Sequence, residues 1–406
     1  MGHLGVHTAG ESHGPAEVCL VEGVPAGLPL EAADIDRELA RRQRGYGRGG
    51  RMRIEQDRVR ILSGVRLGRT LGTPIALVVE NVDHSNWRPT MQPEPEPGFV
   101  VSRVTVPRPG HADLAGMAKY GYEDVRDVLE RSSARETVGR VAAGAVAKVL
   151  LAALGVTVRG RVVTLGPVRS ERPVDPSDPG SVDWVMVERS ECGCDDETAD
   201  SAMRHAVDEA RAAGESLGGV FEVWAWGVVP GVGTYATWRG RLDGRLLGAV
   251  GSIPAVKGVE IGMGMEAAAL PGSAVHDAIL LRDGDIGATR SRDLVRASNH
   301  AGGIEGGMTN GMPVIVRGAM KPIPTLLRPL PSVDLETMLP VEAHVERSDV
   351  EAVAAARVVA EAMVAITLAD AYLDKFGGDG VDETRRAWDA YVDRLEARHL
   401  WRRSSR

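Results

Sequence analysis

Two histidines in glycine-containing turns are the side chains of this sequence best suited to donate a proton. His13 is the fourth residue of a Gly-Glu-Ser-His-Gly segment at residues 10–14, and His111 lies three residues after Arg108 in the segment 108–113. Histidine changes its charge close to neutral pH, and turns built from glycine and proline hold a side chain in a fixed place. The sequence therefore offers two candidate general acids.

The segment at residues 10–14 also has the Gly-x-Ser-x-Gly pattern of a hydrolase nucleophile elbow, with Ser12 as the nucleophile. An elbow needs a buried strand before the serine and a helix after it. Here Pro15 follows at once and residues 18–21 are typical of a strand, so we expect an ordinary glycine-flanked turn. A serine hydrolase that uses Ser12 is kept as the alternative enzyme.

Arginines gather between residues 41 and 53, where a glycine-rich run contains six of them. Guanidinium groups bind carboxylates and phosphates through paired hydrogen bonds, and glycine loops expose backbone N–H groups. The run therefore predicts a site for a small polyanion. RNA binding through residues 41–53 is the alternative, but the net charge of −8 and the apolar segments on both sides disfavour it.

A second anion site is predicted at the start of a helix. Residues 130–136 contain two hydroxyls and two arginines, and Ser133 and Glu136 have the spacing of a capping box. The free N–H groups of a helix start favour phosphate or carboxylate. A glycine-rich loop at residues 296–311 and the turn at 321–325 are further candidates for contact with a ligand.

These segments must be positioned by helices and short strands. Periodicity and capping signals predict helices at residues 32–44, 133–155, 198–213, 348–376 and 383–399. Runs rich in Val, Ile and Trp predict strands at residues 18–21, 59–62, 74–79, 219–229, 255–261 and 312–319, and the proline-rich stretch 89–97 predicts a surface loop. No strict strand-helix-strand alternation is present, which favours an α+β fold over a doubly wound sheet.

The composition excludes several classes of protein. The 406 residues contain no apolar run of membrane-spanning length and no signal-peptide layout at the start, so we expect a cytoplasmic enzyme that binds neither membrane nor nucleic acid. The three cysteines cannot build a disulfide framework, and Cys192 and Cys194 lack the partners of a zinc site, so no metal is predicted. No linker divides the chain, which is compatible with one domain over residues 1–406.

Taken together and in order, these motifs resemble the chorismate synthase family. The similarity is carried by residues 10–14, 45–52, 108–113, 129–137, 301–307 and 319–325. It extends over about residues 8–378, so residues 1–7 and 379–406 are expected to be peripheral. The resemblance implies a single-domain β-α-β sandwich of the α+β class, assembled as a homotetramer.

The resemblance also implies a reaction. Members of the family are lyases that convert 5-enolpyruvylshikimate 3-phosphate into chorismate and phosphate by a 1,4-anti elimination that needs reduced FMN without net redox change. The substrate has two carboxylates and a phosphate, so several arginines must hold it. Whether NADPH reduces the flavin on this protein or a separate flavin reductase supplies it stays open, and the insertion-free length favours the second route.

Individual roles follow from the resemblance. It implies that His13 protonates reduced flavin, that His111 protonates the departing phosphate, that Asp349 is a base near the flavin, and that Ser12 steers His13. The arginines that match substrate or nicotinamide positions are Arg42, Arg48, Arg108 and Arg135. The residues that match the FMN site are Arg131, Ser132, Ser133, Pro254, Ala255, Gly306, Lys321, Pro322, Ile323, Pro324, Thr325 and Arg347. Because Pro254 replaces the amide of many members, a flavin contact there is expected from the backbone.

Overall fold

The structure, a computed structural model, describes residues 4–49, 56–94, 98, 100–281, 293–345 and 349–402, and the backbone of 285–286 and 289–290. Its first sheet is antiparallel, with the strand order β1-β2-β6-β3. The strands are β1 (Gly5–Ala9), β2 (Ala16–Glu22), β6 (Ile75–Glu80) and β3 (Val59–Ile61). Alternate residues of β2, namely Glu17, Cys19 and Val21, are buried, because one face of the sheet is covered by helices.

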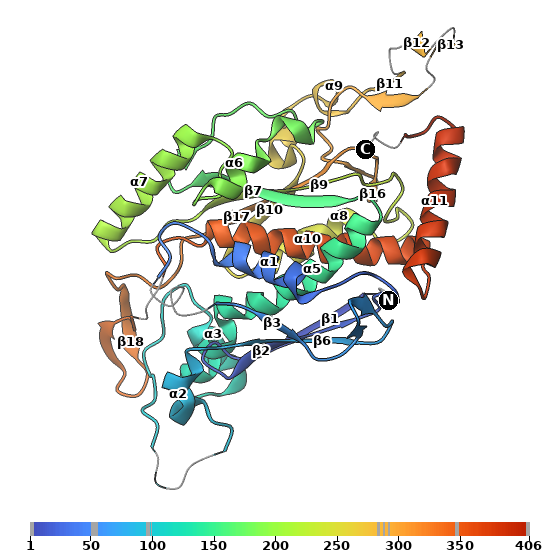
Figure 1. Ribbon diagram of the computed structural model, residues 1–406. Coiled ribbons are helices and arrows are strands. Elements are labelled where there is room, and N and C mark those ends of the chain that lie inside the picture. The colour runs from blue at the N-terminus through green and yellow to red at the C-terminus, as the bar shows by residue number, and fades with distance from the viewer. Residues whose placement is uncertain are drawn as a thin grey trace.

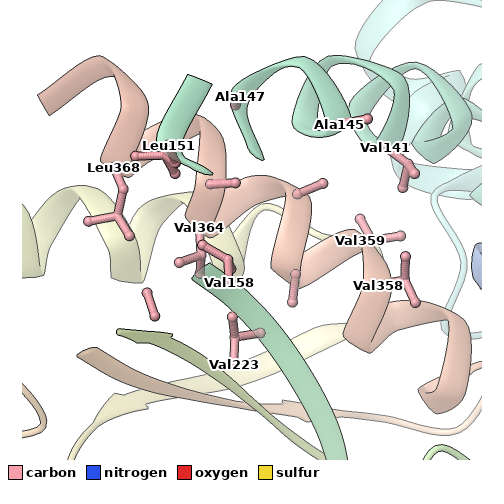
Figure 2. Close-up of a cluster of buried hydrophobic side chains, with 14 of the residues drawn as sticks. Val141, Ala145, Ala147, Leu151, Val158, Val223, Val358, Val359, Val364 and Leu368 are labelled. Atoms are coloured by element: carbon pink, nitrogen blue, oxygen red, sulfur yellow. The ribbon is translucent and has the colours of Figure 1, made fainter. Parts of the chain in front are cut away.

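The second sheet is also antiparallel and has the order β10-β17-β9-β7-β8. Its strands are β10 (Val256–Ile261), β17 (Val314–Met320), β9 (Gly219–Trp226), β7 (Thr157–Leu165) and β8 (Val168–Arg169). Val158 and Val223 extend from this sheet towards the helices, as Figure 2 shows. The β-branched residues predicted as strands therefore supply the second wall of the core.

A layer of helices fills the space between the two sheets (Figure 1). It consists of α1 (Ala32–Gln43), α5 (Thr137–Ala153) and α10 (Val353–Phe376), and α8 (Leu242–Gly251) packs beside α10 against the second sheet. Small residues let α5 and α10 approach closely: a Cβ added to Gly144 would lie 2.2 Å from the Cβ of Ala362. Figure 2 shows valines, alanines and leucines of α5 and α10, which form the core between these two helices.

The remaining elements surround this sandwich. The outer helices are α2 (His84–Met91), α3 (Asp113–Tyr120), α4 (Arg126–Ser132), α6 (Trp184–Arg189), α7 (Glu197–Ala213), α9 (Gly272–Val275) and α11 (Val381–Ala397). Short ribbons pair β4 (Val65–Arg66) with β5 (Arg69–Thr70), β11 (Ile279–Leu281) with β14 (Leu294–Arg296), β12 (Asp285–Ile286) with β13 (Thr289–Arg290), β15 (Ile304–Glu305) with β16 (Met308–Thr309), and β18 (Pro331–Asp334) with β19 (Leu339–Glu342). Helix α11 adds Trp388 and Val392 to the main core.

The predicted α+β class is confirmed, and each predicted helix and strand has a counterpart, but two helix starts differ. Ser133 caps a 3-10 turn (Ala134–Glu136) by accepting the N–H of Arg135 at 3.3 Å, and α5 begins after it. Helix α10 begins at Val353 instead of residue 348. The reason is that Glu351 accepts the N–H of Ala354, whereas Asp349 is turned to other partners.

The proline-rich stretch predicted as a surface loop begins as a helix, and its residues 95–97 lie outside the described residues. Pro89 lies inside α2, and the chain becomes irregular at residues 92–94. This short helix brings Trp87 to the side of the molecule where the turn at residues 10–14 lies. Among the described residues, no helix combines the length and apolar character needed to cross a membrane.

Candidate active site

A cavity of about 980 Å³ borders the starts of α5 and α10. It is lined by residues from the turn between β1 and β2, from α1, α2 and α4, and from the turn that follows β17. Within the described part of the chain, the basic residues in the lining are Arg42, Arg48, Arg108, Arg126, Arg131, Arg135, Arg140 and Lys321, against the acidic Asp83, Glu136 and Asp349. This excess of positive charge suits a ligand with several negative charges.

His13 is held in this cavity by α4. Its backbone N–H donates to Glu130 Oε2 at 2.9 Å, and its ring Nδ1 lies 3.0 Å from both oxygens of that carboxylate. The His13 ring stacks on Trp87, with 4.0 Å between the ring centroids. Ser12 donates its N–H to the Glu130 carbonyl and accepts a hydrogen bond from the Ser133 hydroxyl. Strand β2 follows the turn, so the geometry of a hydrolase elbow is not present.

His111 is held by a second carboxylate in the same manner. Its Nδ1 lies 2.5 Å from Asp113 Oδ1, and Asp113 is fully buried. Arg108 donates to Asp113 Oδ2 from its backbone N–H at 3.0 Å and from Nε at 2.9 Å. Burial alone would raise the pKa of Asp113, but the hydrogen bonds from His111 and Arg108 outweigh it and hold that pKa below its ordinary value. The ionised Asp113 thus orients both a predicted acid and a predicted substrate arginine.

Arg42 and Arg135 share one buried carboxylate. Nη1 of Arg135 donates to Asp57 Oδ1 at 2.6 Å, and Nη1 of Arg42 lies 3.5 Å from Oδ2 of the same side chain. Nε of Arg42 donates to Thr137 at 2.9 Å, and Nε of Arg135 donates to Asn81 at 2.7 Å. Burial lowers the pKa of Arg42 to about 10, although Asp57 acts in the opposite direction. Two cations are therefore fixed side by side, and Arg42 stays charged at neutral pH.

Arg48 is paired with Asp349, the predicted base. Nη1 of Arg48 lies 2.7 Å from Asp349 Oδ2, and Asp349 Oδ1 accepts the N–H of Gly49 at 2.5 Å. The Nε of Arg48 is buried and has no hydrogen-bond partner among the described residues. Two donors therefore place the carboxylate in the cavity, while Arg48 keeps a donor that a bound anion can satisfy.

Most of the residues predicted to bind FMN line the cavity. Ala255 has a φ of +68°, and its carbonyl accepts the N–H of Lys321 at 3.0 Å, which joins the Pro254 turn to the turn after β17. Small side chains at the start of α10 add an apolar surface, formed by Ala352, Ala355, Ala356 and Val359. A flat ring system that carries a phosphate needs an apolar surface next to cations. With the unsatisfied Nε of Arg48 nearby, the residues present fit FMN.

The predicted site residues that line the cavity are Ser12, His13, Arg42, Arg48, Arg108, His111, Arg131, Ser132, Ser133, Arg135, Pro254, Ala255, Lys321, Ile323, Pro324, Thr325 and Asp349. Gly306, in the turn between β15 and β16, and Pro322 are not part of this lining. Arg347 lies outside the described residues. The roles of all the predicted site residues, whether or not they line the cavity, stay predictions.

The run of arginines divides between two environments. Arg42 faces the cavity, whereas its neighbour Arg41 donates to the buried Glu361 at 2.6 and 2.8 Å and also pairs with Glu188. Successive residues of a helix point about 100° apart, so neighbours on α1 need not share a partner. Part of the run, residues 50–53, lies outside the described residues.

Several residues that build the site were assigned no role from the sequence. Glu130 lies within the predicted anion segment 130–136 and contacts His13. Its position two and three residues before Ser132 and Ser133 was a signal that could have identified it. Asp57, Asn81 and Trp87 come from other segments and reach the site only through tertiary contacts. Their side chains position the arginines and His13, so their contribution is one of orientation.

Comparison with known proteins agrees with this geometry. The family model described as chorismate synthase matches residues 4–373. A chorismate synthase of Desulforudis audaxviator is 56% identical over 390 residues, which cover 96% of this chain and 97% of that protein. One of Rubrobacter xylanophilus is 54% identical over 397 residues, with 97% of each chain covered. A chorismate synthase crystal structure has a TM-score of 0.78 and 41% identity, covering 97% of this chain and 99% of its own. This chain therefore belongs to the chorismate synthase family, the lyases that convert 5-enolpyruvylshikimate 3-phosphate into chorismate and phosphate in the last step of the shikimate pathway.

Proposed function

We propose that the cavity next to α5 and α10 holds the substrate and reduced FMN together, with His13 and His111 as proton donors. The observation that carries this assignment is that both histidines and the four predicted arginines, from distant parts of the sequence, line one cavity. The chain belongs to a flavin-dependent lyase family, so its reaction is elimination of phosphate from a cyclohexene that carries three anionic groups.

Substrate binding is assigned to the arginines. Arg42 and Arg135 are already held at a fixed separation by Asp57, and Arg108 is held by Asp113. A cluster fixed in this way binds two carboxylates and a phosphate without first having to order its own side chains. Mutual repulsion between the anionic groups of the substrate is thereby overcome.

The elimination breaks the bond between a ring carbon and the phosphate oxygen and removes a ring proton, and the electrons of the C–H bond end in the new diene. Reduced FMN, when bound, supplies electron density to this step and is unchanged at its end. We assign to His111 the proton that the departing phosphate receives, because Asp113 holds its ring in the cavity among the arginines assigned to the substrate. When reduced FMN is bound, His13 would donate a proton towards it, and Asp349 would be the base in that region that takes up the proton removed from the substrate ring.

An anaerobic assay tests this assignment. Purified protein is mixed with dithionite-reduced FMN and 5-enolpyruvylshikimate 3-phosphate, and chorismate is followed by its absorbance. The expected result is continuous product formation with reduced FMN and none with oxidised FMN. Binding of oxidised FMN without any turnover by the reduced form would contradict the proposal.

The source of reduced flavin is a separate proposal. We infer that a flavin reductase supplies reduced FMN and that NADPH does not reduce the flavin on this protein. In support, the chain and its relative from Desulforudis audaxviator match over 96% and 97% of their lengths, which leaves little room for an inserted nicotinamide-binding segment. Aerobic turnover with NADPH and FMN alone would overturn this inference.

We also propose that the chain is a single domain and assembles as a homotetramer in the cytoplasm. One core cluster contains residues of both sheets and of the helices between them, which supports a single domain.

The ribbon of β11 and β14 extends from the body and exposes Ile279, Leu280 and Leu281, which is typical of a surface that contacts another subunit (Figure 1). Light scattering should give four times the chain mass of 43.2 kDa. A cytoplasmic location is favoured because a substrate with three anionic groups does not cross a bilayer unaided.

A further inference from the structure

Glu130 contacts the turn that carries His13 through both its side chain and its backbone. Its carboxylate accepts the backbone N–H of His13 at 2.9 Å and lies 3.0 Å from the ring Nδ1, and its carbonyl accepts the N–H of Ser12 at 2.9 Å. The side chain is 4% exposed. One residue of α4 thus holds both the backbone and the ring of His13.

A second set of contacts involves one face of the His13 ring and the His13 carbonyl. Trp87 stacks on the ring, and the guanidinium of Arg126 lies over Trp87, 4.9 Å from its ring centroid. Arg126 also donates to Glu130 Oε1 at 3.0 Å. His84 places its Nδ1 2.9 Å from the His13 carbonyl. The imidazole is therefore confined between a carboxylate at one edge and an indole on one face.

The carboxylate determines which ring nitrogen carries a proton. An ionised carboxylate can only accept, so a ring nitrogen that is bonded to it must be the protonated one. Burial would raise the pKa of Glu130, but the hydrogen bond and charge of His13 and the charge of Arg126 outweigh it and lower that pKa. Glu130 therefore stays ionised, Nδ1 keeps its proton, and proton exchange with a ligand falls to Nε2.

The second acid of the site shows the same construction from unrelated residues. Nδ1 of His111 faces Asp113, and Arg108 donates to that carboxylate as Arg126 donates to Glu130, although Nη2 of Arg108 also lies 3.1 Å from Nδ1 of His111. The two pairs of histidine and carboxylate come from different segments of the chain. Their agreement indicates that the orientation of each histidine depends on its carboxylate.

We propose that Glu130 is a positioning residue that fixes His13 with its proton on Nδ1, so that Nε2 exchanges the proton used in turnover. This proposal rests on the assignment of His13 as a proton donor. Trp87 fixes the plane of the His13 ring, and Arg126 helps to keep the Glu130 carboxylate ionised. Glu130 acts through His13 and has no direct part in the chemical step.

A double-mutant cycle tests this dependence. Glu130→Gln keeps the shape of the side chain but allows either tautomer of His13, and we expect kcat to fall by at least about 100-fold, the usual contribution of a general acid. In a His13→Ala background the same change should have no further effect on kcat, because the residue it acts through is gone. Asp127→Asn, an exposed acid on the same helix, is the matched control and should leave kcat unchanged.

The outcomes separate the two proposals. If Glu130→Gln lowers kcat by the same factor with and without His13, Glu130 acts independently and its positioning role is wrong. If His13→Ala keeps the turnover of the unaltered enzyme, the proton-donor assignment of His13 fails, and the role of Glu130 is then decided by a structural readout alone.

That readout is the ¹⁵N spectrum of histidine-labelled protein, with the His13 signals identified by their loss in His13→Ala. In the unaltered enzyme the neutral His13 ring should carry its proton on Nδ1, and in Glu130→Gln the Nε2 tautomer should become populated. A neutral ring with a bare Nδ1 in the unaltered enzyme overturns the proposal, even if the glutamine variant does not fold.

Discussion

Replacing Glu17 by glutamine is expected to stabilise the protein at pH 8 but hardly at pH 5. Glu17 lies on β2, is 2% exposed, and neither of its carboxylate oxygens has a hydrogen-bond partner among the described residues. Oε2 lies 3.7 Å from Nη1 of Arg131. Burial raises the pKa of Glu17 from 4.5 to about 7, although the charges of Arg135 and Arg131 act in the opposite direction.

The sign of the effect follows from the direction of this change. An acid whose pKa is higher in the folded protein than in the unfolded chain binds its proton more tightly when folded. Its contribution to stability is present below the unfolded value of 4.5 and is lost as the pH rises through about 7. One pH unit corresponds to about 1.4 kcal/mol, so the loss at pH 8 is ~3 kcal/mol. Glutamine has nearly the same shape and no charge at either pH, so Glu17→Gln avoids this loss.

Urea unfolding at pH 5 and pH 8 measures the effect. The free energy of unfolding of Glu17→Gln should exceed that of the unaltered protein by ~3 kcal/mol at pH 8 and by less than about 1 kcal/mol at pH 5. Glu22→Gln, at the exposed end of the same strand, is the control and should show no such difference. If the unaltered protein and Glu17→Gln lose stability in parallel between the two pH values, Glu17 does not ionise in the buried state described here.

Three further changes test other parts of the structure. Gly144→Ala places a Cβ against Ala362 and should cost about 1–3 kcal/mol in a thermal melt, and an unchanged melting temperature would show that α5 and α10 can separate at no cost. Asp57→Asn removes the carboxylate shared by two arginines and should lower kcat/KM by about 100-fold in the steady-state assay, so an effect below about threefold argues against preorganisation. His111→Ala should lower kcat by at least about 100-fold while oxidised FMN still binds, and the exposed His205→Ala is its control. Turnover close to that of His205→Ala would show that His111 is not the acid that protonates the departing phosphate.

Local sequence patterns predicted several of the elements that carry the site, but not α2 or α4. The apolar spacing after Ser133 predicted α5, and the apolar run at residues 18–21 predicted β2. The turns of the two histidines could also be located, because Gly10 and Gly110 adopt φ values of +130° and +78°, where other residues are strained. The roles within those turns came from a family resemblance, and the fold class came from the mixture of patterns.

The partners of the functional groups could not be predicted, since no local pattern connects them. Arg135 binds Asp57 and Asn81, which precede it by 78 and 54 residues. The start of α10 was misplaced for a related reason. The segment 348–351 has the residue types and spacing of a helix start, but a tertiary partner, Arg48, binds the side chain of Asp349. Competition between local and distant partners is decided only in the folded chain.

The carboxylate of Asp57 also affects how the site responds to ionic strength. Asp57 and Arg135 are almost fully buried, so the ion pair between them is screened by dissolved salt much less than a surface pair would be. The two arginines therefore keep their spacing in dilute buffer and in concentrated salt alike. Only the long-range attraction of the substrate to the cavity weakens as salt is added. Added salt should slow the arrival of the substrate more than it loosens the substrate once bound.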